Sequence, residues 1–181
     1  MTQHPSRLEW IRAALEQYEA PLMRYATYLV GDAERARDVV QETFLHLCRA
    51  DRSKVEDHLA AWLFRVCRNR TLDMRRKEKR VQALEPMTEN NLESPEPGPE
   101  AKVARRQDAG RVAEILKTLP EKQREAIYLR FQGGLSYKEI SGVTGHSVSN
   151  VGFLIHTAVK KIRERMLADN QLDGALVGGA R

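Results

Sequence analysis

The sequence predicts an all-α fold in which two small helical domains are joined by a flexible acidic linker. Apolar residues recur at steps of three and four along both halves of the 181-residue chain, which is the period of an amphipathic helix. Nothing in residues 1–80 alternates with period two for long enough to be a strand. Residues 81–101 contain five glutamates, four of the seven prolines and no Lys or Arg, so they cannot bury enough surface to offset their ordering entropy.

These features divide the chain into four parts. We expect a first domain at residues 1–80, the linker at 81–102, a second domain at 103–168 and a C-terminal tail at 169–181. The tail contains Gly174, Gly178 and Gly179, and it either is disordered or folds on a partner.

Composition excludes several classes of protein. No apolar run approaches the roughly 18–20 residues of a membrane span, and the first residues lack the apolar core of a signal peptide, so we expect a cytoplasmic protein without membrane insertion. Cys48 and Cys67 form no CxxC motif and have no metal-ligand partner pattern, which indicates two buried thiols rather than a disulfide framework or a zinc site. We expect neither a metal nor a cofactor.

The first half predicts three helices. The first carries the stripe Leu8, Ile11, Leu15, Tyr18, Leu22, Tyr25 and Leu29, which Pro21 kinks or divides. Gly31-Asp32 supplies a break and a cap for a second helix, with the apolar face Ala36, Val40, Phe44 and Leu47. A third stripe comprises Leu59, Trp62, Leu63, Val66 and Cys67. It leads directly into residues 65–80, in which eight of the sixteen residues are Lys or Arg.

Four helices are predicted in the second half. The first runs from Val103 to Leu119, and the next begins at Pro120, which a helix's first turn tolerates. That helix ends at Gly133-Gly134 and has a core side of Ala126, Ile127, Tyr128, Leu129 and Phe131. Ser136 and Glu139 form a capping box for a short helix, and Gly145 suits a positive φ in the turn that follows. Ser147 caps a long last helix with the packed face Val148, Val151, Ile155, Ala158 and Ile162.

A helix, a short turn and a second helix make the layout of a helix-turn-helix, whose second helix enters the DNA major groove. The basic segment 65–80 raises the local potential enough to attract a polyanion, although a solvated helix face is the alternative. Two such modules on an acidic tether, which would not itself bind phosphate, suit a protein that contacts two separated DNA elements.

Four segments resemble motifs of bacterial sigma-70-type sigma factors. In the first domain, Asp38 to Leu45 (DVVQETFL) resembles D-x-x-Q-E-x-F, and Ala61 to Val66 (AWLFRV) with Arg68-Asn69 and Asp73 resembles A/T-W-L-x-R-I-x-x-N. In the second domain, Leu119 to Glu125 (LPEKQRE) and Leu135 to Ile140 (LSYKEI) resemble L-P-x-x-x-R-E and L-S-Y-x-E-I-A. The matches cover residues 8–80 and 103–166 in the family's order. With only these two domains, the chain is similar to the extracytoplasmic-function (ECF) sigma factors.

The resemblance implies a fold and a function. Two helical domains would bind core RNA polymerase and direct it to promoter DNA, the first at the minus-ten element and the second at the minus-thirty-five element, and the chain would not be an enzyme. Asp38, Gln41, Glu42 and Leu45 recur at steps of three and four, so they share one flank of their helix. The resemblance implies that this strip docks on the clamp helices of the polymerase β′ subunit. A solvated acidic flank is the alternative.

Asn69 is the residue expected to read the minus-ten element. An amide can satisfy the Watson–Crick edge of an extruded base, and the resemblance places this asparagine in a base pocket, although a helix C-cap is the alternative. Promoter phosphates and the displaced strand would be met by Arg65, Arg68, Arg70, Arg75, Arg76, Lys77, Lys79 and Arg80. Capturing unpaired bases offsets the cost of strand opening, so the chain could help to melt a promoter without ATP. Trp62, on an apolar stripe, is expected in the core.

The recognition helix departs from the family pattern, because Ser147 to Val159 contains no Lys or Arg. Base reading would fall to Ser149, Asn150 and His156, and phosphate anchoring to Lys138, the late basic residues and the helix N-terminus. The full set expected at the minus-thirty-five element is Lys138, Ser147, Ser149, Asn150, Phe153, His156, Lys160 and Lys161. Alternatively, Phe153 and Leu154 are exposed and pack on another protein.

Two rival functions are weaker. A stand-alone helix-turn-helix transcriptional regulator explains residues 103–166 but leaves the motifs of the first domain as coincidences. An enzyme acting on nucleic acid would need a metal site or nucleophile arrangement, whereas the five histidines are scattered. The resemblance also implies an anti-sigma factor that packs between the domains and masks both DNA surfaces. Control by transcription of its own gene is the alternative to such an inhibitor.

Overall fold

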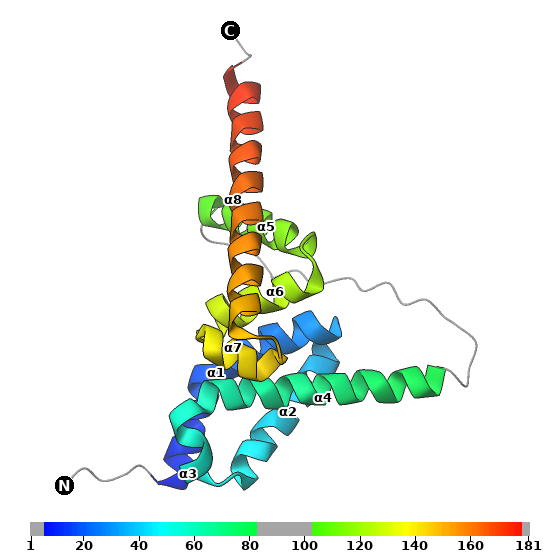
Figure 1. Ribbon diagram of the computed structural model, residues 1–181, viewed down its shortest axis with the longest axis vertical. Coiled ribbons are helices and arrows are strands. Elements are labelled where there is room, and N and C mark those ends of the chain that lie inside the picture. The colour runs from blue at the N-terminus through cyan, green and yellow to red at the C-terminus, as the bar shows by residue number, and fades with distance from the viewer. Residues whose placement is uncertain (1–5, 83–102, 179–181) are drawn as a thin grey trace, which may run out of the picture.

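The computed structural model describes residues 6–82 and 103–178, which consist only of helices and the turns between them (Figure 1). This confirms the all-α prediction. The helices of the first half are α1 (Arg7–Val30), α2 (Ala33–Arg49), α3 (Arg52–Val55), the 3₁₀ turn η1 (Glu56–His58) and α4 (Leu59–Gln82). Those of the second half are α5 (Val103–Lys117), α6 (Glu121–Ile127), the π-helical segment η2 (Tyr128–Gln132), α7 (Tyr137–Thr144) and α8 (Val148–Gly178).

The predicted linker and tail overlap these helices at their edges. Helix α4 continues to Gln82, and residues 83–102 of the predicted linker lie outside the described residues. Helix α8 extends past residue 168 to Gly178, so the expected tail begins within a helix, and residues 179–181 lie outside the described part. In Figure 1, α8 rises away from the remaining helices toward the C-terminus, while α4 runs across the molecule below it.

Local capping signals set the helix ends where the sequence predicts them. Gly31 ends α1 in the left-handed region at φ 79°, and the Asp32 carboxylate accepts a hydrogen bond from the Arg35 amide at 2.8 Å. Ser136 and Glu139 form the expected capping box of α7, and Gly145 ends that helix at φ 78°. These groups satisfy backbone donors and acceptors that a helix end leaves unpaired.

The core of the first domain lies where α1, α2 and α4 pack together. Helix α1 contributes Trp10, Ala14, Leu22, Tyr25 and Ala26, α2 contributes Ala36, Val39, Val40, Phe44 and Leu47, and α4 contributes Leu63, Phe64 and Cys67. Trp62 is partly buried and packs against this core, as expected. Desolvation raises the pKa of the buried Cys67 thiol to about 12.

Three expectations for this domain are wrong. Leu8 is 80% exposed, because the packed face of α1 begins on the neighbouring stripe of Trp10 and Ala14. Of the two alternatives for Pro21, division of the helix is wrong, because Pro21 lies inside one continuous helix, while a kink there stays a prediction. Tertiary packing of the turns that follow offsets the lost backbone hydrogen bond. Cys48 is exposed rather than buried, because it follows Leu47 on the outward side of α2.

The second domain packs α8 against α5, α6 and α7. Its buried residues include Leu129, Leu135, Ile140, Val143, Val151, Ile155 and Ala158. Leu154 is also buried, which contradicts its expected exposure beside Phe153, whereas Val148 is 47% exposed because it stands at the very start of α8.

Phe131 is the clearest error in the predicted core, since it is 65% exposed. Residues Tyr128–Gln132 are π-helical, and the Gly133 amide donates to the Tyr128 carbonyl five residues back. A π turn holds more residues than an α turn. Side chains within this segment are therefore rotated relative to an α-helical register, and Leu129 lies inside while Phe131 lies outside.

The two domains share one continuous hydrophobic core. Helix α7 packs on α4, and η2 packs on α1, as Figure 1 shows for α7 beside α4. The Tyr28 and Tyr128 rings are stacked with their centroids 4.5 Å apart. At Gly133, a Cβ atom would lie 3.1 Å from the Phe64 ring, so the absence of a side chain permits this close approach.

None of the helices within residues 6–82 and 103–178 is both long enough and apolar enough to cross a lipid bilayer.

Two glycines of α7 and its C-cap give a matched test of the fold. A Cβ at Gly142 or at Gly145 meets nothing within 4 Å, but only Gly145 has a positive φ. We expect Gly145→Ala to lower the free energy of unfolding by about 1–2 kcal/mol, because an L side chain is strained in the left-handed region. Gly142→Ala should raise it by about 0.5–1 kcal/mol through helix propensity. Urea unfolding followed by circular dichroism measures both, and equal stabilities or the opposite order would contradict the assigned turn.

Candidate nucleic-acid interface

Helix α2 presents the predicted polar strip to solvent. Asp38, Gln41, Glu42 and Leu45 are all exposed, Leu45 at 47%. Val40, Phe44 and Leu47 face the core from the opposite flank. The strip therefore offers another molecule a surface that combines acidic, amide and apolar side chains.

The strip is linked to the basic segment of α4 through Arg70. The Arg70 guanidinium lies 3.7 Å from the Glu42 carboxylate and contacts the His46 ring. Glu42 thus belongs both to the exposed strip and to a contact that orients a basic side chain. Arg70 is half-buried rather than free in solvent.

The basic residues of α4 are sorted onto three stripes by the helical repeat of about 100° per residue. An outer stripe carries Arg65, Asn69 and Arg76, all of which are exposed. A second stripe, Arg68 and Arg75, faces the second domain, and a third, Arg70 and Lys77, lies toward α2. The side chains of Lys79 and Arg80 lie outside the described residues.

Asn69 lies in the middle of α4, which continues to Gln82. The alternative that Asn69 caps the end of a helix is therefore wrong. Its exposed side chain sits one turn after Arg65 on the outer stripe, where an amide is available to a nucleic-acid base with a cation beside it.

The second stripe is engaged by acidic residues of α6. The Arg68 Nε donates to Glu125 Oε1 at 2.8 Å, and Tyr25 Oη donates to the same oxygen at 2.8 Å. Arg75 lies 3.8 Å from the Glu121 carboxylate. Glu125 is 6% exposed and Tyr25 is 1% exposed, whereas the Arg68 side chain is 22% exposed. A buried carboxylate is thus paired with a partly buried guanidinium and a buried hydroxyl.

This environment shifts the pKa values of both partners of Glu125. Desolvation and the Glu125 carboxylate raise the pKa of Tyr25 well above its ordinary value. Desolvation opposes the charge on Arg68, but the hydrogen bond and charge of Glu125 prevail and raise the pKa of its guanidinium. Both groups therefore remain donors to the carboxylate at neutral pH.

Sequence reasoning missed this cluster. The sequence pattern places Tyr25 on an apolar stripe and Arg68 among DNA-binding cations, and it gives Glu125 only as the last residue of the L-P-x-x-x-R-E motif. Residues 25 and 125 are separated by a hundred positions, and nothing in the local pattern indicates that they meet.

Helices α7 and α8 have the geometry of a helix-turn-helix. Ser141 Oγ donates to the His146 carbonyl at 2.6 Å and fixes the turn, and Ser147 Oγ accepts from the Asn150 amide at 3.2 Å as the expected cap of α8. The residues predicted to meet the minus-thirty-five element are all exposed: Lys138, Ser147, Ser149, Asn150, Phe153, His156, Lys160 and Lys161.

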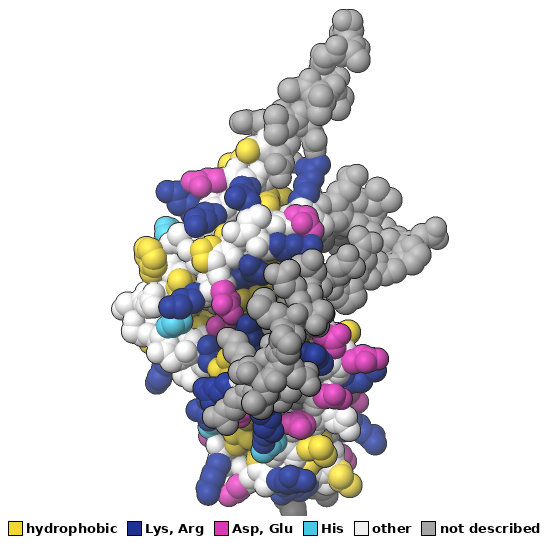
Figure 2. Space-filling view, turned by 90° about the vertical axis from the view of Figure 1, so that its right-hand side faces the viewer, with side chains coloured by type: hydrophobic (Ala, Val, Ile, Leu, Met, Phe, Trp, Pro, Cys, Tyr) yellow, Lys and Arg dark blue, Asp and Glu magenta, His cyan; other side chains and the backbone are white. Residues whose placement is uncertain are grey.

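The late basic residues of α8 are partly paired with neighbouring polar side chains. Lys160 lies 3.9 Å from Glu164, and Arg165 donates to Thr118 Oγ1 at 2.6 Å. Figure 2 shows Lys and Arg side chains both around α8 and in the lower part of the molecule, interspersed with acidic ones. On this face the Lys and Arg side chains are thus spread over both halves of the molecule.

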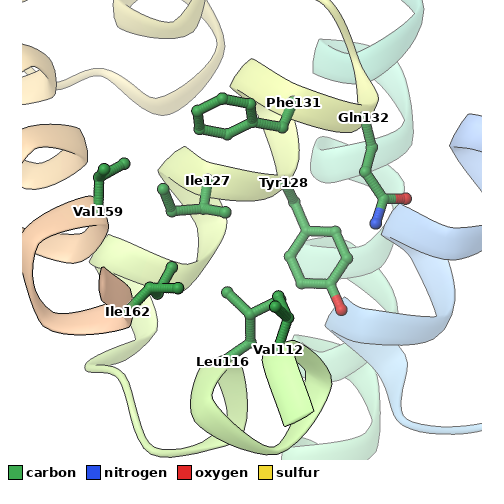
Figure 3. Close-up of a pocket in the computed structure, with 8 residues that line it drawn as sticks. All are labelled: Val112, Leu116, Ile127, Tyr128, Phe131, Gln132, Val159 and Ile162. Atoms are coloured by element: carbon green, nitrogen blue, oxygen red, sulfur yellow. The ribbon is translucent and has the colours of Figure 1, made fainter. Parts of the chain in front are cut away.

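An apolar groove with a volume of about 310 Å³ opens between α5, α6, η2 and α8 (Figure 3). Its wall includes Val112, Leu116, Ile127, Val159 and Ile162, with Phe131 at one side. Tyr128 and Gln132 line it as well, and both also contact α1, through the Tyr28 ring and a hydrogen bond from Arg24. The segment η2 therefore separates the groove from the contact between the domains.

Within the described residues, no group of three or more His, Cys, Asp or Glu side chains is placed to hold a metal ion.

Comparison with known proteins agrees with this geometry. The Sigma-70 region 2 family model matches residues 14–81, and the Sigma-70, region 4 model matches residues 109–162. The chain is 32% identical over 156 residues to the ECF RNA polymerase sigma factor EcfG of Rhodopseudomonas palustris. This aligned stretch covers 85% of this chain and 81% of that protein. It is 30% identical over 155 residues to SigL of Mycobacterium tuberculosis, with 84% and 86% covered.

The fold also resembles a solved sigma factor structure. RpoE of Bartonella quintana, in complex with the anti-sigma factor NepR, superposes with a TM-score of 0.65 at 23% identity over 87% of this chain and 97% of that one. The two family models together match most of both halves of the chain, in the same order along the sequence. The chain belongs to the extracytoplasmic-function sigma factors of the sigma-70 family, and it binds core RNA polymerase and directs it to promoter DNA.

Proposed function

We propose that the outer stripe of α4 binds the minus-ten element. The observation that carries this assignment is the shared face of Arg65, Asn69 and Arg76 at steps of four and seven, all exposed on a helix whose other side is buried. An amide between two cations can hold an extruded base by its edge while the cations bind flanking phosphates. Lys77, which is also exposed, would add a further phosphate contact. Lys79 and Arg80 stay in the expected set from the sequence, because their side chains lie outside the described part. The captured base offsets part of the cost of opening the duplex.

The minus-thirty-five element is assigned to the exposed face of α7 and α8. Ser149, Asn150 and His156 supply hydrogen-bonding groups for base edges, and Phe153 supplies an apolar contact of the kind that suits a thymine methyl. Because Ser147 Oγ accepts a hydrogen bond from the Asn150 amide, the hydroxyl proton of Ser147 is still available to donate to DNA. Lys138, Lys160 and Lys161 supply phosphate contacts.

The strip of Asp38, Gln41, Glu42 and Leu45 is assigned to the clamp helices of the polymerase β′ subunit. Its exposure and its mixture of acidic, amide and apolar groups suit a basic or amide-rich helical partner. The stand-alone regulator is not favoured, because such a protein has no use for this surface.

Three coarser assignments follow from the family. Sigma factors are initiation factors, and we assign no catalytic reaction to this chain. It would act in the cytoplasm, where promoter DNA and polymerase are found. The likeness to a sigma factor bound by NepR supports an anti-sigma factor as a partner, with control by transcription of its own gene as the alternative.

Two asparagines test the assignment of the promoter elements reciprocally. We expect Asn69→Ala to lower initiation about tenfold and to flatten the minus-ten preference, because one good base contact contributes about 1–3 kcal/mol of discrimination. Asn150→Ala should instead change the minus-thirty-five preference alone. Run-off transcription from a promoter library with purified core polymerase measures both preferences. If Asn69→Ala left the minus-ten preference intact, the base-pocket assignment would be wrong.

Two exposed leucines of the first domain test the docking strip. Leu45→Ala should weaken binding to core polymerase roughly tenfold, because the variant lacks the apolar contact that the exposed half of the Leu45 side chain makes in the complex. Leu8→Ala removes the same atoms from a side chain that is 80% exposed and lies off the strip, so it should bind as the wild type does. Competition with another sigma factor for core polymerase measures both affinities. Equal affinities for the two variants would contradict the assigned surface.

A further inference from the structure

The guanidinium of Arg70 on α4 is held by two side chains of α2. Its Nη2 contacts Nε2 of the His46 ring, and its Nε lies 3.7 Å from Oε2 of Glu42. Because a guanidinium has donors but no acceptor, the ring nitrogen accepts the hydrogen bond, and His46 is bound in its neutral form. The Arg70 side chain is 37% exposed, compared with 75% for Arg76 on the outer stripe. Arg70 therefore lies at the contact between two helices rather than on the open face of α4.

Arg70 also points away from the residues assigned to the minus-ten element. Each residue turns an α-helix by about 100°, so Arg65, Asn69 and Arg76 lie within about 40° of one another. By the same rotation, Arg70 lies about 120° from the middle of that stripe. A DNA strand that follows the stripe would pass on another side of the helix. A phosphate that approached Arg70 would also have to compete with the carboxylate and the imidazole that already hold it.

Glu42 belongs to the docking strip of Asp38, Gln41, Glu42 and Leu45, and it stays open to a partner. Its side chain is 58% exposed, and a carboxylate has two oxygens, so one can face Arg70 while the other meets another molecule. Glutamate has several rotamers, and fixing such a side chain at an interface costs affinity. A cation that holds the carboxylate near one position before docking lowers this cost.

A second ion pair joins the same two helices about two turns away. Arg35 of α2 lies 2.8 Å from the Glu78 carboxylate of α4, so here α2 supplies the cation and α4 the anion. Seven residues of α2 separate Arg35 from Glu42, which is about 10 Å along the helix. This pair therefore fastens α2 to α4 at a point too distant to orient the Glu42 carboxylate.

We propose that Arg70 is a positioning residue for polymerase docking rather than a contact to promoter DNA, and that it acts by orienting the Glu42 carboxylate within the docking strip. The proposal rests on the assignment of that strip to the clamp helices of the β′ subunit. It extends the docking surface from α2 to one side chain of α4, and it removes Arg70 from the cations expected at the minus-ten element. The oriented carboxylate suits a cationic or amide donor on the partner helix.

Arg70→Ala and Arg65→Ala form a matched pair, because each removes one arginine side chain from α4. Affinity for core polymerase is measured without DNA, by competition of each full-length variant with a labelled sigma factor. Promoter engagement is measured separately, by run-off transcription with each variant in saturating excess over core polymerase. At saturation a weakened docking contact no longer limits transcription, whereas a lost promoter contact still does.

We expect Arg70→Ala to bind core polymerase roughly threefold more weakly, within the range of exposed ion pairs, and to reach the wild-type level of transcription at saturation. Arg65→Ala should show the reverse, with less transcript at saturation and no loss of core affinity. Unchanged core affinity of Arg70→Ala overturns the proposal. Reduced transcription by Arg70→Ala at saturation also overturns it, because Arg70 would then act at the promoter.

A double-mutant cycle with Glu42→Ala separates positioning from direct contact. If Arg70 acts only through the Glu42 carboxylate, Arg70→Ala should lower core affinity in the wild-type background and cause no further loss in the Glu42→Ala background. Equal losses in both backgrounds overturn the proposal, since Arg70 would then touch polymerase itself or act through the packing of α4.

Glu78→Gln is the control for attachment of the helices, because it removes the second ion pair between α2 and α4. It should bind core polymerase as the wild type does. A loss of affinity equal to that of Arg70→Ala overturns the proposal, since either ion pair would then act by fastening α2 to α4.

Leu45→Ala distinguishes failure of this proposal from failure of the docking strip. If Leu45→Ala lowers core affinity and Arg70→Ala does not, the strip stands and Arg70 has no part in it. If neither variant lowers core affinity, the assignment of the strip has failed, and the role of Arg70 fails with it.

Discussion

One continuous helix, α4, must serve several neighbours at once, and the rest of the molecule is arranged around it. Its 24 residues bury Leu63, Phe64 and Cys67 in the core, and the helical repeat then fixes where every other side chain points. A step of seven residues is close to two full turns, so Arg68 and Arg75 must face the same neighbour. The basic segment is consequently divided by angle into a stripe for solvent, a stripe for α6 and a stripe for α2.

Features encoded by a few adjacent residues could be predicted from the sequence. The cap at Asp32, the capping box of Ser136 and Glu139, and the positive φ of Gly145 depend only on local geometry, so their signals are complete within one turn. The polar strip of α2 follows from helical periodicity for the same reason. The resemblance to sigma factors rests on such segments, which is why it identified the family.

Features set by packing or by irregular backbone could not be predicted in this way. The π-helical turn rotated Phe131 out of the expected core, because an assumed α-helical period cannot register an inserted residue. The contact between Glu125 and its two donors joins three helices across separations of 57 and 100 residues. A charged residue in a short helix gives no sign that it will be buried, since burial depends on where the partner domain lies.

The recognition helix explains why the placement of the domains matters for promoter binding. The region from Ser147 to Val159 contains no Lys or Arg. In the proposed assignment of α8 to promoter DNA, this region would release few counterions and gain little affinity from phosphate contacts. Hydrogen bonds from Ser, Asn and His side chains to base edges discriminate between sequences, but they do not replace the affinity that phosphate contacts supply. A second contact through the covalently joined first domain raises the effective concentration of each module at the promoter. That gain requires both modules to engage the promoter at once.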